Sequence, residues 1–342
     1  MTHAAREHRI LRCMNNRILC GLLTCAMALG GCVEPAADKK NAPAPQPPAT
    51  VSTPGTLQSA HEAYLEGDFL ALGERVRDVL LDTRSNDVVK DNALELLDKA
   101  YETQKGSLPS RFVLPEGFER IKYGVVRGMN GQSAFFHVFL YGHTRDVSHL
   151  KSVSVRRLPS EVLLDSSPDS GKGTLKIKHD KPGYDTFVVE RVMTALPSDG
   201  VFSLRFELDD GTSPEGWFIS RSQAASASPE IRTPVSAASI TDVHPVVSWV
   251  PFRSPEYKPF EYRTLSVYVS REGADGVSWD IWMQNYGELG AVKVGDHPPA
   301  AKTSLIPGDY WLNITCGEGR MFGPIGMTRE SRSVAPFHVV VP

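Results

Sequence analysis

The sequence predicts a mainly β protein: two β-sandwiches in tandem, preceded by a small α-helical module. Three observations lead to this fold class. Apolar residues recur with helical spacing between positions 57 and 100. Short apolar runs bounded by Gly, Pro, Asp or Ser then occupy residues 113–221. Alternating apolar residues mark strands across 230–342.

The first 31 residues have the composition of an export signal. Four arginines (Arg6, Arg9, Arg12 and Arg17) come before an apolar run of 12 residues, 18–29. A membrane-spanning helix needs roughly 20 apolar residues, so this run is too short to remain as an anchor. Met14 is an alternative start, because residues 14–17 already supply a positive segment.

A cysteine follows the small residues that end this signal. The segment Leu29-Gly30-Gly31-Cys32 resembles the lipobox of bacterial lipoproteins. The resemblance implies cleavage between Gly31 and Cys32 and a diacylglycerol on the Cys32 thiol, so that the membrane is a partner through lipid. Several acyl chains, at about 0.8 kcal/mol per buried CH₂, anchor a protein stably. Val33 in place of Asp favours the outer membrane by the family's sorting rule. The protein would then face either the periplasm or the cell surface.

Charge and cysteine content narrow the class of protein further. Removing residues 1–31 takes away four arginines and one glutamate, so the net charge of −3 becomes −6. An acidic body argues against nucleic acid as a partner, which requires a basic face. Beyond the signal and Cys32, only Cys316 is left, so no internal disulfide forms. We expect Cys316 to be a buried structural thiol.

The chain after the lipobox begins with a segment that predicts no fold. Residues 32–56 are rich in Pro, Ala and Thr and have no apolar periodicity, which is typical of a disordered tether. Residues 57–106 then predict a helical module with apolar faces at 57–65, 69–81 and 88–100. Its segment Tyr64-Leu-Glu-Gly67-Asp-Phe69 resembles the helix corner of a tetratricopeptide repeat, as a single unit.

Residues 113–221 predict the first sandwich. Strands are expected at 121–127, 133–141, 152–158, 174–178, 186–193, 201–208 and 216–220. Asn130-Gly131 between the first two is a strong hairpin signal. Seven short strands without helical periodicity favour a β-sandwich, and a linker is expected at 222–229.

The second sandwich, residues 230–342, carries a more specific motif. Residues 305–310 (Leu-Ile-Pro-Gly-Asp-Tyr) lead into a strand that bears Leu312 and Ile314. This resembles the tyrosine corner of fibronectin type III and other immunoglobulin-like modules, in which the Tyr hydroxyl bonds upstream backbone. The resemblance implies a sandwich fold and leaves function open.

No catalytic or cofactor motif stands out from the residues. The segment Gly171-Lys172-Gly173-Thr174 lacks the first glycine of a phosphate loop, and 209–212 is too short for a calcium loop. His137, His143 and His149 recur every six residues without carboxylate or thiol partners at set spacing. We therefore predict no cofactor and no metal.

One group of aromatic residues is the candidate binding surface. Alternation along three predicted strands places Tyr268, Trp282 and Trp311 on one outer face beside polar neighbours, with Tyr286 at the edge. Such a face suits stacking on sugar rings or anchoring a protein. The alternatives are that this face packs against the first sandwich, or that a bulge reverses the alternation.

These features lead to three hypotheses about function. The main one is a lipid-anchored, non-catalytic envelope protein that acts as an interaction or scaffold module. The second is a glycan- or peptidoglycan-binding lipoprotein that uses the aromatic face. The third is an envelope hydrolase with loop carboxylates from the first sandwich, for example Asp165, Asp169, Asp185 or Asp209.

Overall fold

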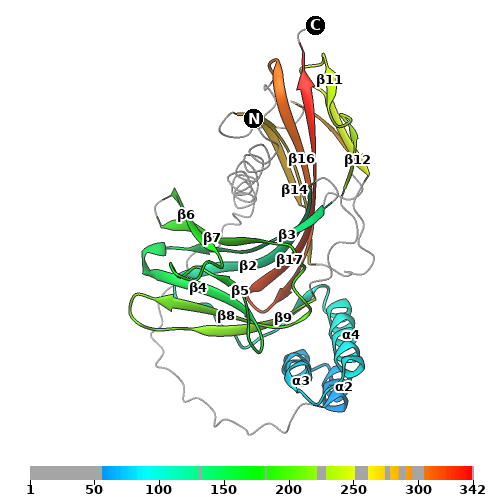
Figure 1. Cartoon of the computed structure of the whole chain (residues 1–342). Helices are drawn as coiled ribbons and strands as arrows, with labels where there is room; N and C mark the ends of the chain where they lie inside the picture. Colours follow the sequence, from blue (N-terminus) through cyan, green and yellow to red (C-terminus); the bar gives the residue numbers. More distant parts are fainter. Residues whose placement is uncertain are drawn as a thin grey trace, which may run out of the picture.

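A computed structural model describes residues 56–130, 133–181, 183–221, 229–250, 261–273, 278–284, 290–294 and 304–340. The predicted signal at 1–31, nearly all of the predicted tether and most of the linker lie outside these ranges. Within them, no helix is long and apolar enough to cross a bilayer. Figure 1 shows the helices at one end of the molecule and the C-terminus at the other.

The N-terminal module consists of three helices, as predicted: α2 (Leu57–Glu66), α3 (Phe69–Leu81) and α4 (Asp87–Thr103). Thr56 caps α2 through a capping box with Ser59. Gly67 ends the helix in the left-handed region at φ 75°, where glycine carries no Cβ penalty. Asp68 then caps α3, so the predicted Gly67 corner joins two helices directly.

The first sandwich contains every strand that the sequence predicts. These strands are β2 (Phe118–Asn130), β3 (Ser133–Thr144), β4 (Leu150–Arg157), β6 (Thr174–Lys181), β7 (Tyr184–Met193), β8 (Gly200–Leu208) and β9 (Glu215–Ser220). The β2–β3 hairpin pairs Asn130 with Ser133, as the Asn130-Gly131 signal predicts. The prediction missed β5 (Glu161–Asp165), a short edge strand of the four-stranded sheet β5-β4-β8-β9.

The second sandwich has two facing sheets. Its strands are β10 (Glu230–Thr233), β11 (Ala238–Ile240), β12 (Val246–Val250), β13 (Tyr262–Arg271), β14 (Trp279–Gln284), β15 (Ala291–Lys293), β16 (Gly308–Phe322) and β17 (Ile325–Val339). The sheet β10-β12-β15 faces the run β14-β13-β16-β17, the immunoglobulin-like arrangement of antiparallel sheets. The Tyr310 hydroxyl donates to the Ile306 carbonyl at 2.7 Å, which confirms the tyrosine corner. The predicted fold class is confirmed.

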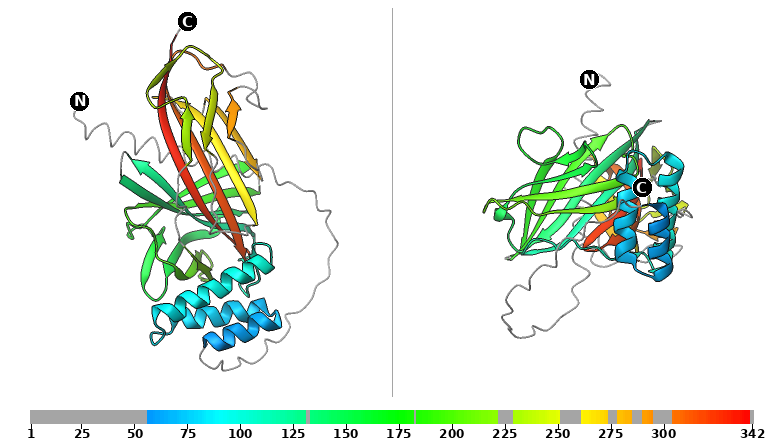
Figure 2. Two further views of the ribbon diagram at one scale, coloured as in Figure 1. Left: turned by 90° about the vertical axis from the view of Figure 1, so that its right-hand side faces the viewer. Right: turned by 90° about the horizontal axis from the view of Figure 1, so that it is seen from below.

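A single sheet runs through both sandwiches. Its ten strands include the path β14-β13-β16-β17-β2-β3-β7-β6, with β1 (Ser107–Leu108) on β16 and β11 on β17. The residues 325–331 of β17 pair in parallel with 121–127 of β2. The β16–β17 hairpin therefore belongs to the second sandwich at one end and lies inside the first sandwich at the other (Figures 1 and 2).

The two hydrophobic cores lie on the same face of this sheet. Ile121 and Tyr123 of β2 belong to the first core, which also includes the helices and the hairpin tip residues Phe322 and Ile325. Leu265 and other alternate residues of β13 and β16 belong to the second core. Cys316 is buried there as a free thiol, as predicted.

The opposite face of the ten-stranded sheet is called the outer face below. It bears Tyr268, Thr315, Glu330 and Val126, because paired residues point to the same side of a sheet. A small separate cluster of buried residues lies on it: Val126, Phe139, Tyr141 and Val188.

Candidate interaction surface

The structure brings the predicted aromatic positions together on the outer face. Strands β13, β14 and β16 are neighbours in the sheet. Tyr268 is opposite Asn313, and Trp311 is opposite Ser270 on β13. Trp282 is opposite Ser266 on the other side of β13. Positions 268, 282 and 311 therefore share one side of the sheet, because their pairing partners alternate with the same parity.

These aromatic positions differ in accessibility. Tyr268 is only 3% exposed, so its ring is not an open stacking platform. Trp311 is half-buried. The Trp282 side chain and all of Tyr286 lie outside the described residues. Among the described side chains of this group, Trp311 is therefore more accessible than Tyr268.

A second part of the outer face is charged. On β3, His137 is 1% exposed and its Nε2 lies 3.0 Å from Oε2 of Glu190 on β7. Lys176 of β6 also pairs with Glu190. On β2, Lys122 reaches Glu330 of β17 at 3.0 Å. Five adjacent strands thus contribute titratable side chains to one side of the sheet, where most of them are buried.

The pKa of Glu190 reflects its burial and its two basic neighbours, His137 and Lys176. Burial alone raises the pKa of a carboxyl group, because it disfavours the charged form. His137 and Lys176 lower it more, through hydrogen bonds and charge, so that the net pKa of Glu190 is below its usual value. Glu190 and Lys176 were not expected as site residues, since only strand pairing brings them to His137.

The three histidines that recur along the sequence do not converge. His137 and His143 share the outer side of β3, and His143 is bonded to Tyr141 (2.6 Å) and Thr186 (3.2 Å). His149 lies on the connection to β4, where it pairs with Asp209. Over the described ranges, no group of three ligand side chains is placed to hold a metal ion.

The four carboxylates of the hydrolase hypothesis have separate surroundings. Asp165 accepts from Ser167 at the end of β5, while Asp169 lies in the loop that follows. Asp185 of β7 accepts from the Val147 amide and contacts His179, and Asp209 pairs with His149. In the part of the chain that the structure describes, no two of them are hydrogen-bonded to each other or share a partner.

A partly buried ionic cluster lies on the other face of the sheet and joins the helices to the end of the first sandwich and to the tip of the long hairpin. Asp98 of α4 accepts from Arg320 of β16 at 2.7 Å and also pairs with Arg221, which follows β9. Arg221 reaches Asp199 as well, and the Arg320 guanidinium lies 4.7 Å from the Tyr101 ring centroid. These residues (Asp98, Asp199, Arg221 and Arg320) are called the Asp98 cluster below.

The pKa of Arg221 reflects its place in this cluster. Burial lowers the pKa of the guanidinium, but Asp98 and Asp199 raise it further, so the net shift is upward. Nothing in the local sequence marks these four residues, because they come from four distant segments. The cluster fixes α4, the end of the first sandwich and the long hairpin relative to one another.

Comparisons with known proteins give no family. No family model matches the chain, and no curated protein matches it. Among solved structures, it is similar to fibronectin(III)-like modules of Clostridium thermocellum CbhA, at 6% identity over 64% of this chain and 93% of that one, with a TM-score of 0.21. Chicken CNTN1 FN1–FN3 domains match at 12% identity over 66% of each chain, with a TM-score of 0.22. The tandem Ig repeats of Dlar match at 13% over 65% and 96%, with a TM-score of 0.28. The fold description therefore rests on the chain's own topology.

Proposed function

We propose that this chain is a lipid-anchored protein of the cell envelope that acts as a non-catalytic interaction or scaffold module. Lipid on Cys32 holds it at a membrane, by the lipobox resemblance of Leu29-Gly30-Gly31-Cys32. The outer membrane is the expected location, facing the periplasm or the cell surface. The partner is an envelope protein, reached by the body beyond the tether.

The observation that carries this proposal is the continuity of the ten-stranded sheet. Each strand of the β16–β17 hairpin has 15 residues, a length of about 50 Å at about 3.3 Å per residue. The hairpin is paired along its length in one sandwich or the other, and the Asp98 cluster ties it to α4. A body built this way presents distant surfaces in one fixed orientation, which is what a scaffold requires.

The anchor is tested by metabolic labelling with a radioactive fatty acid. The native chain is expected to carry the label, and Cys32→Ser to lose it. Cys316→Ser is the matched control, because Cys316 is buried in the second core and is expected to leave labelling unchanged. Label retained on the Cys32→Ser chain would overturn the lipoprotein assignment.

The interaction role is tested by site-specific photo-crosslinking in intact cells with the lipidated protein. A photoreactive residue at Trp311, on the outer face, is expected to give a discrete adduct with an envelope protein. The matched position is Arg84, whose side chain is 77% exposed on the helical module, and which is expected to give none. Identical patterns from the two positions would refute a role for the outer face.

A glycan is the second candidate ligand. Trp311 favours it, since a half-buried indole on the outer face suits stacking on a sugar ring. Binding to peptidoglycan fragments and polysaccharides is expected to fall at least tenfold in Trp282→Ala plus Trp311→Ala. Leu81→Ala, at an exposed helical position, is the control. Unchanged binding in the double variant would exclude this face as the glycan site.

A further inference from the structure

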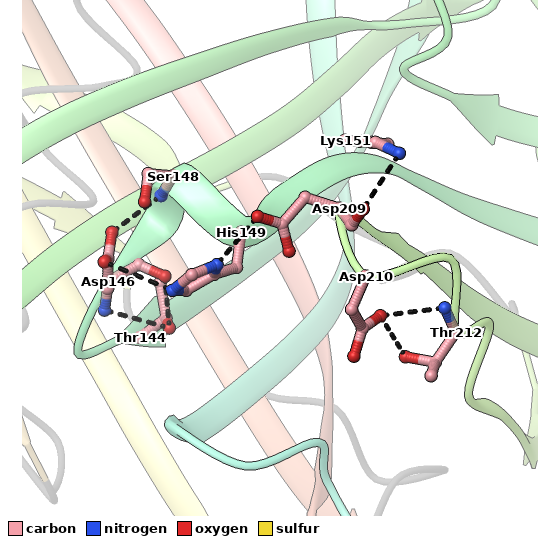
Figure 3. A network of polar contacts seen from close by, with 8 residues as sticks. All are labelled: Thr144, Asp146, Ser148, His149, Lys151, Asp209, Asp210 and Thr212. Carbon is pink, nitrogen blue, oxygen red and sulfur yellow. Dashed lines mark hydrogen bonds and ion pairs between the residues drawn. The ribbon is translucent and has the colours of Figure 1, made fainter.

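Two turns at one end of the first sandwich meet at His149 (Figure 3). The short helix η2 (Val147–His149) joins β3 to β4, and residues 209–212 join β8 to β9. His149 Nδ1 lies 3.0 Å from Asp209 Oδ2, across the two turns. His149 Nε2 lies 3.5 Å from Asp146 Oδ2, within its own turn. The Asp209 amide also donates to the His149 carbonyl at 3.0 Å. The imidazole is therefore the side-chain bridge between carboxylates of two connections that already share a backbone hydrogen bond.

Both turns carry further carboxyl groups, and each turn has hydrogen bonds of its own. Asp146 accepts from the Ser148 amide at 2.8 Å, and Asp210 accepts from the Thr212 amide at 2.8 Å and its hydroxyl at 2.7 Å. These bonds lower the pKa of both carboxyl groups, so both remain ionised. Each of these hydrogen bonds lies within one turn and does not involve the imidazole.

The charged and titratable groups near the imidazole come from its own turn, from the facing turn and from two strands. From the β8–β9 connection these are Asp209 and Asp210, and from its own connection Asp146. Lys151 on β4 donates to the Asp209 carbonyl at 3.3 Å, and His179 on β6 lies near enough to affect Asp146. When the histidines are neutral, the three carboxylates and the Lys151 ammonium together carry a net charge of −2. Protonation of His149 removes one of them at the position between Asp146 and Asp209.

We propose that His149 is a proton-operated latch that holds the two turns together as an imidazolium and loosens them when neutral. The inference goes beyond the proposed function, because it concerns the mobility of one end of the first sandwich. Neutral imidazole still bonds Asp209, but it no longer offsets the repulsion between the carboxylates of the two turns. The acidic end then becomes more mobile and more negative.

The direction of the pH dependence follows from the surroundings of His149. The hydrogen bond with Asp209, the charge of Asp209 and the charge of Asp146 raise the pKa of the imidazole above its ordinary value. A group whose pKa is raised in the folded state contributes its stabilisation below the unfolded value and loses it as pH rises through the folded value. The latch is therefore closed in acid and loosens toward alkaline pH.

Hydrogen exchange on the full lipidated chain in detergent micelles tests the latch. Protection of the peptides that cover 144–151 and 208–214 is measured at pH 5.5 and 8.5, each corrected for intrinsic exchange. In the native chain we expect protection to be about two- to fivefold higher at the lower pH, in line with an exposed ion pair. His149→Lys, which keeps the charge, is expected to be protected at both pH values. His149→Gln is expected to be less protected at both.

The control is His338→Gln, which removes another surface histidine that pairs with an aspartate, Asp309 at 2.6 Å, in the second sandwich. It is expected to leave the pH dependence of both peptides as in the native chain. Unchanged protection in all other peptides shows that the variants are folded. The native pH dependence persisting in His149→Gln would overturn the proposal.

Discussion

Asp98 of α4 and Arg320 of β16 are 222 positions apart in sequence, yet their Oδ1 and Nη1 atoms lie 2.7 Å apart. The Arg320 side chain is 3% exposed, and Asp98 also pairs with Arg221. One carboxylate thus pairs with two guanidinium groups that come from different parts of the fold, and Asp199 supplies the second negative charge through Arg221. The helical module is held to the long hairpin by charge as well as by apolar contact.

The first prediction concerns this carboxylate. Asp98→Asn leaves Arg320 buried without its counter-charge, and we expect the free energy of unfolding to fall by about 2–3 kcal/mol. The value is at the low end for a buried pair, because Asp98 itself is 23% exposed. Chemical denaturation measures it. Asp91→Asn, on the exposed side of α4, is the control, and an equal loss in both variants would contradict the role of the cluster.

The second prediction concerns packing on the outer face. A Cβ at Gly124 would lie 2.3 Å from the Phe139 ring and 2.4 Å from the Thr328 methyl group, so the ring occupies the space that a side chain at 124 would need. Gly124→Ala is expected to cost about 1–3 kcal/mol of unfolding free energy by overpacking. Adding Phe139→Leu should recover part of that loss, since the smaller side chain makes room. Strictly additive losses in the double variant would refute the steric coupling.

The third prediction concerns the tyrosine corner. Tyr310→Phe removes the hydrogen bond to the Ile306 carbonyl and leaves the ring stacked on Phe337. We expect a loss of about 1 kcal/mol in thermal or chemical unfolding. Tyr64→Phe, whose half-buried ring contacts Phe69, is the comparison and is expected to change stability little. The loss of unfolding free energy is therefore expected to be larger in Tyr310→Phe than in Tyr64→Phe.

The fourth prediction concerns acid. The pKa of Glu190 is lowered below its usual 4.5, against the effect of burial, by His137 and Lys176. A carboxyl group with a depressed folded-state pKa contributes stability above its unfolded pKa and loses it as pH falls through the folded value. Stability is therefore expected to decline below about pH 4.5, and the decline to be shallower in Glu190→Gln. Glu102→Gln, at an exposed position of α4, should keep the native profile.

Local pattern was sufficient for most elements of the fold. The three helices follow from apolar spacing and from caps such as Thr56 and Asp68, which act within a few residues. The β2–β3 hairpin follows from Asn130-Gly131, and the Tyr310 corner from its own short motif. Strand β5 was missed because its five residues alternate too briefly to stand out among polar neighbours.

The candidate sites depended far less on local pattern. Alternation predicts positions 268, 282 and 311 on one side of a sheet, and the strand register agrees. Alternation carries no information on what covers that side. The burial of Tyr268 to 3% exposure is decided by packing. Likewise the His137–Glu190 contact requires β3 and β7 to be paired in one particular register.

By itself, the sequence determined the class of the described segments: the three helices, the strands and the two sandwiches. These depend on interactions among residues close together in the chain, which periodicity, caps and turn residues report directly. The lipobox at Cys32 stays a prediction. Only the tertiary structure decided that β17, besides its hairpin partner β16, pairs with β2, and that Asp98 meets Arg320. Such pairings are set by the burial of two cores and of opposite charges between segments hundreds of residues apart, and no local pattern encodes them.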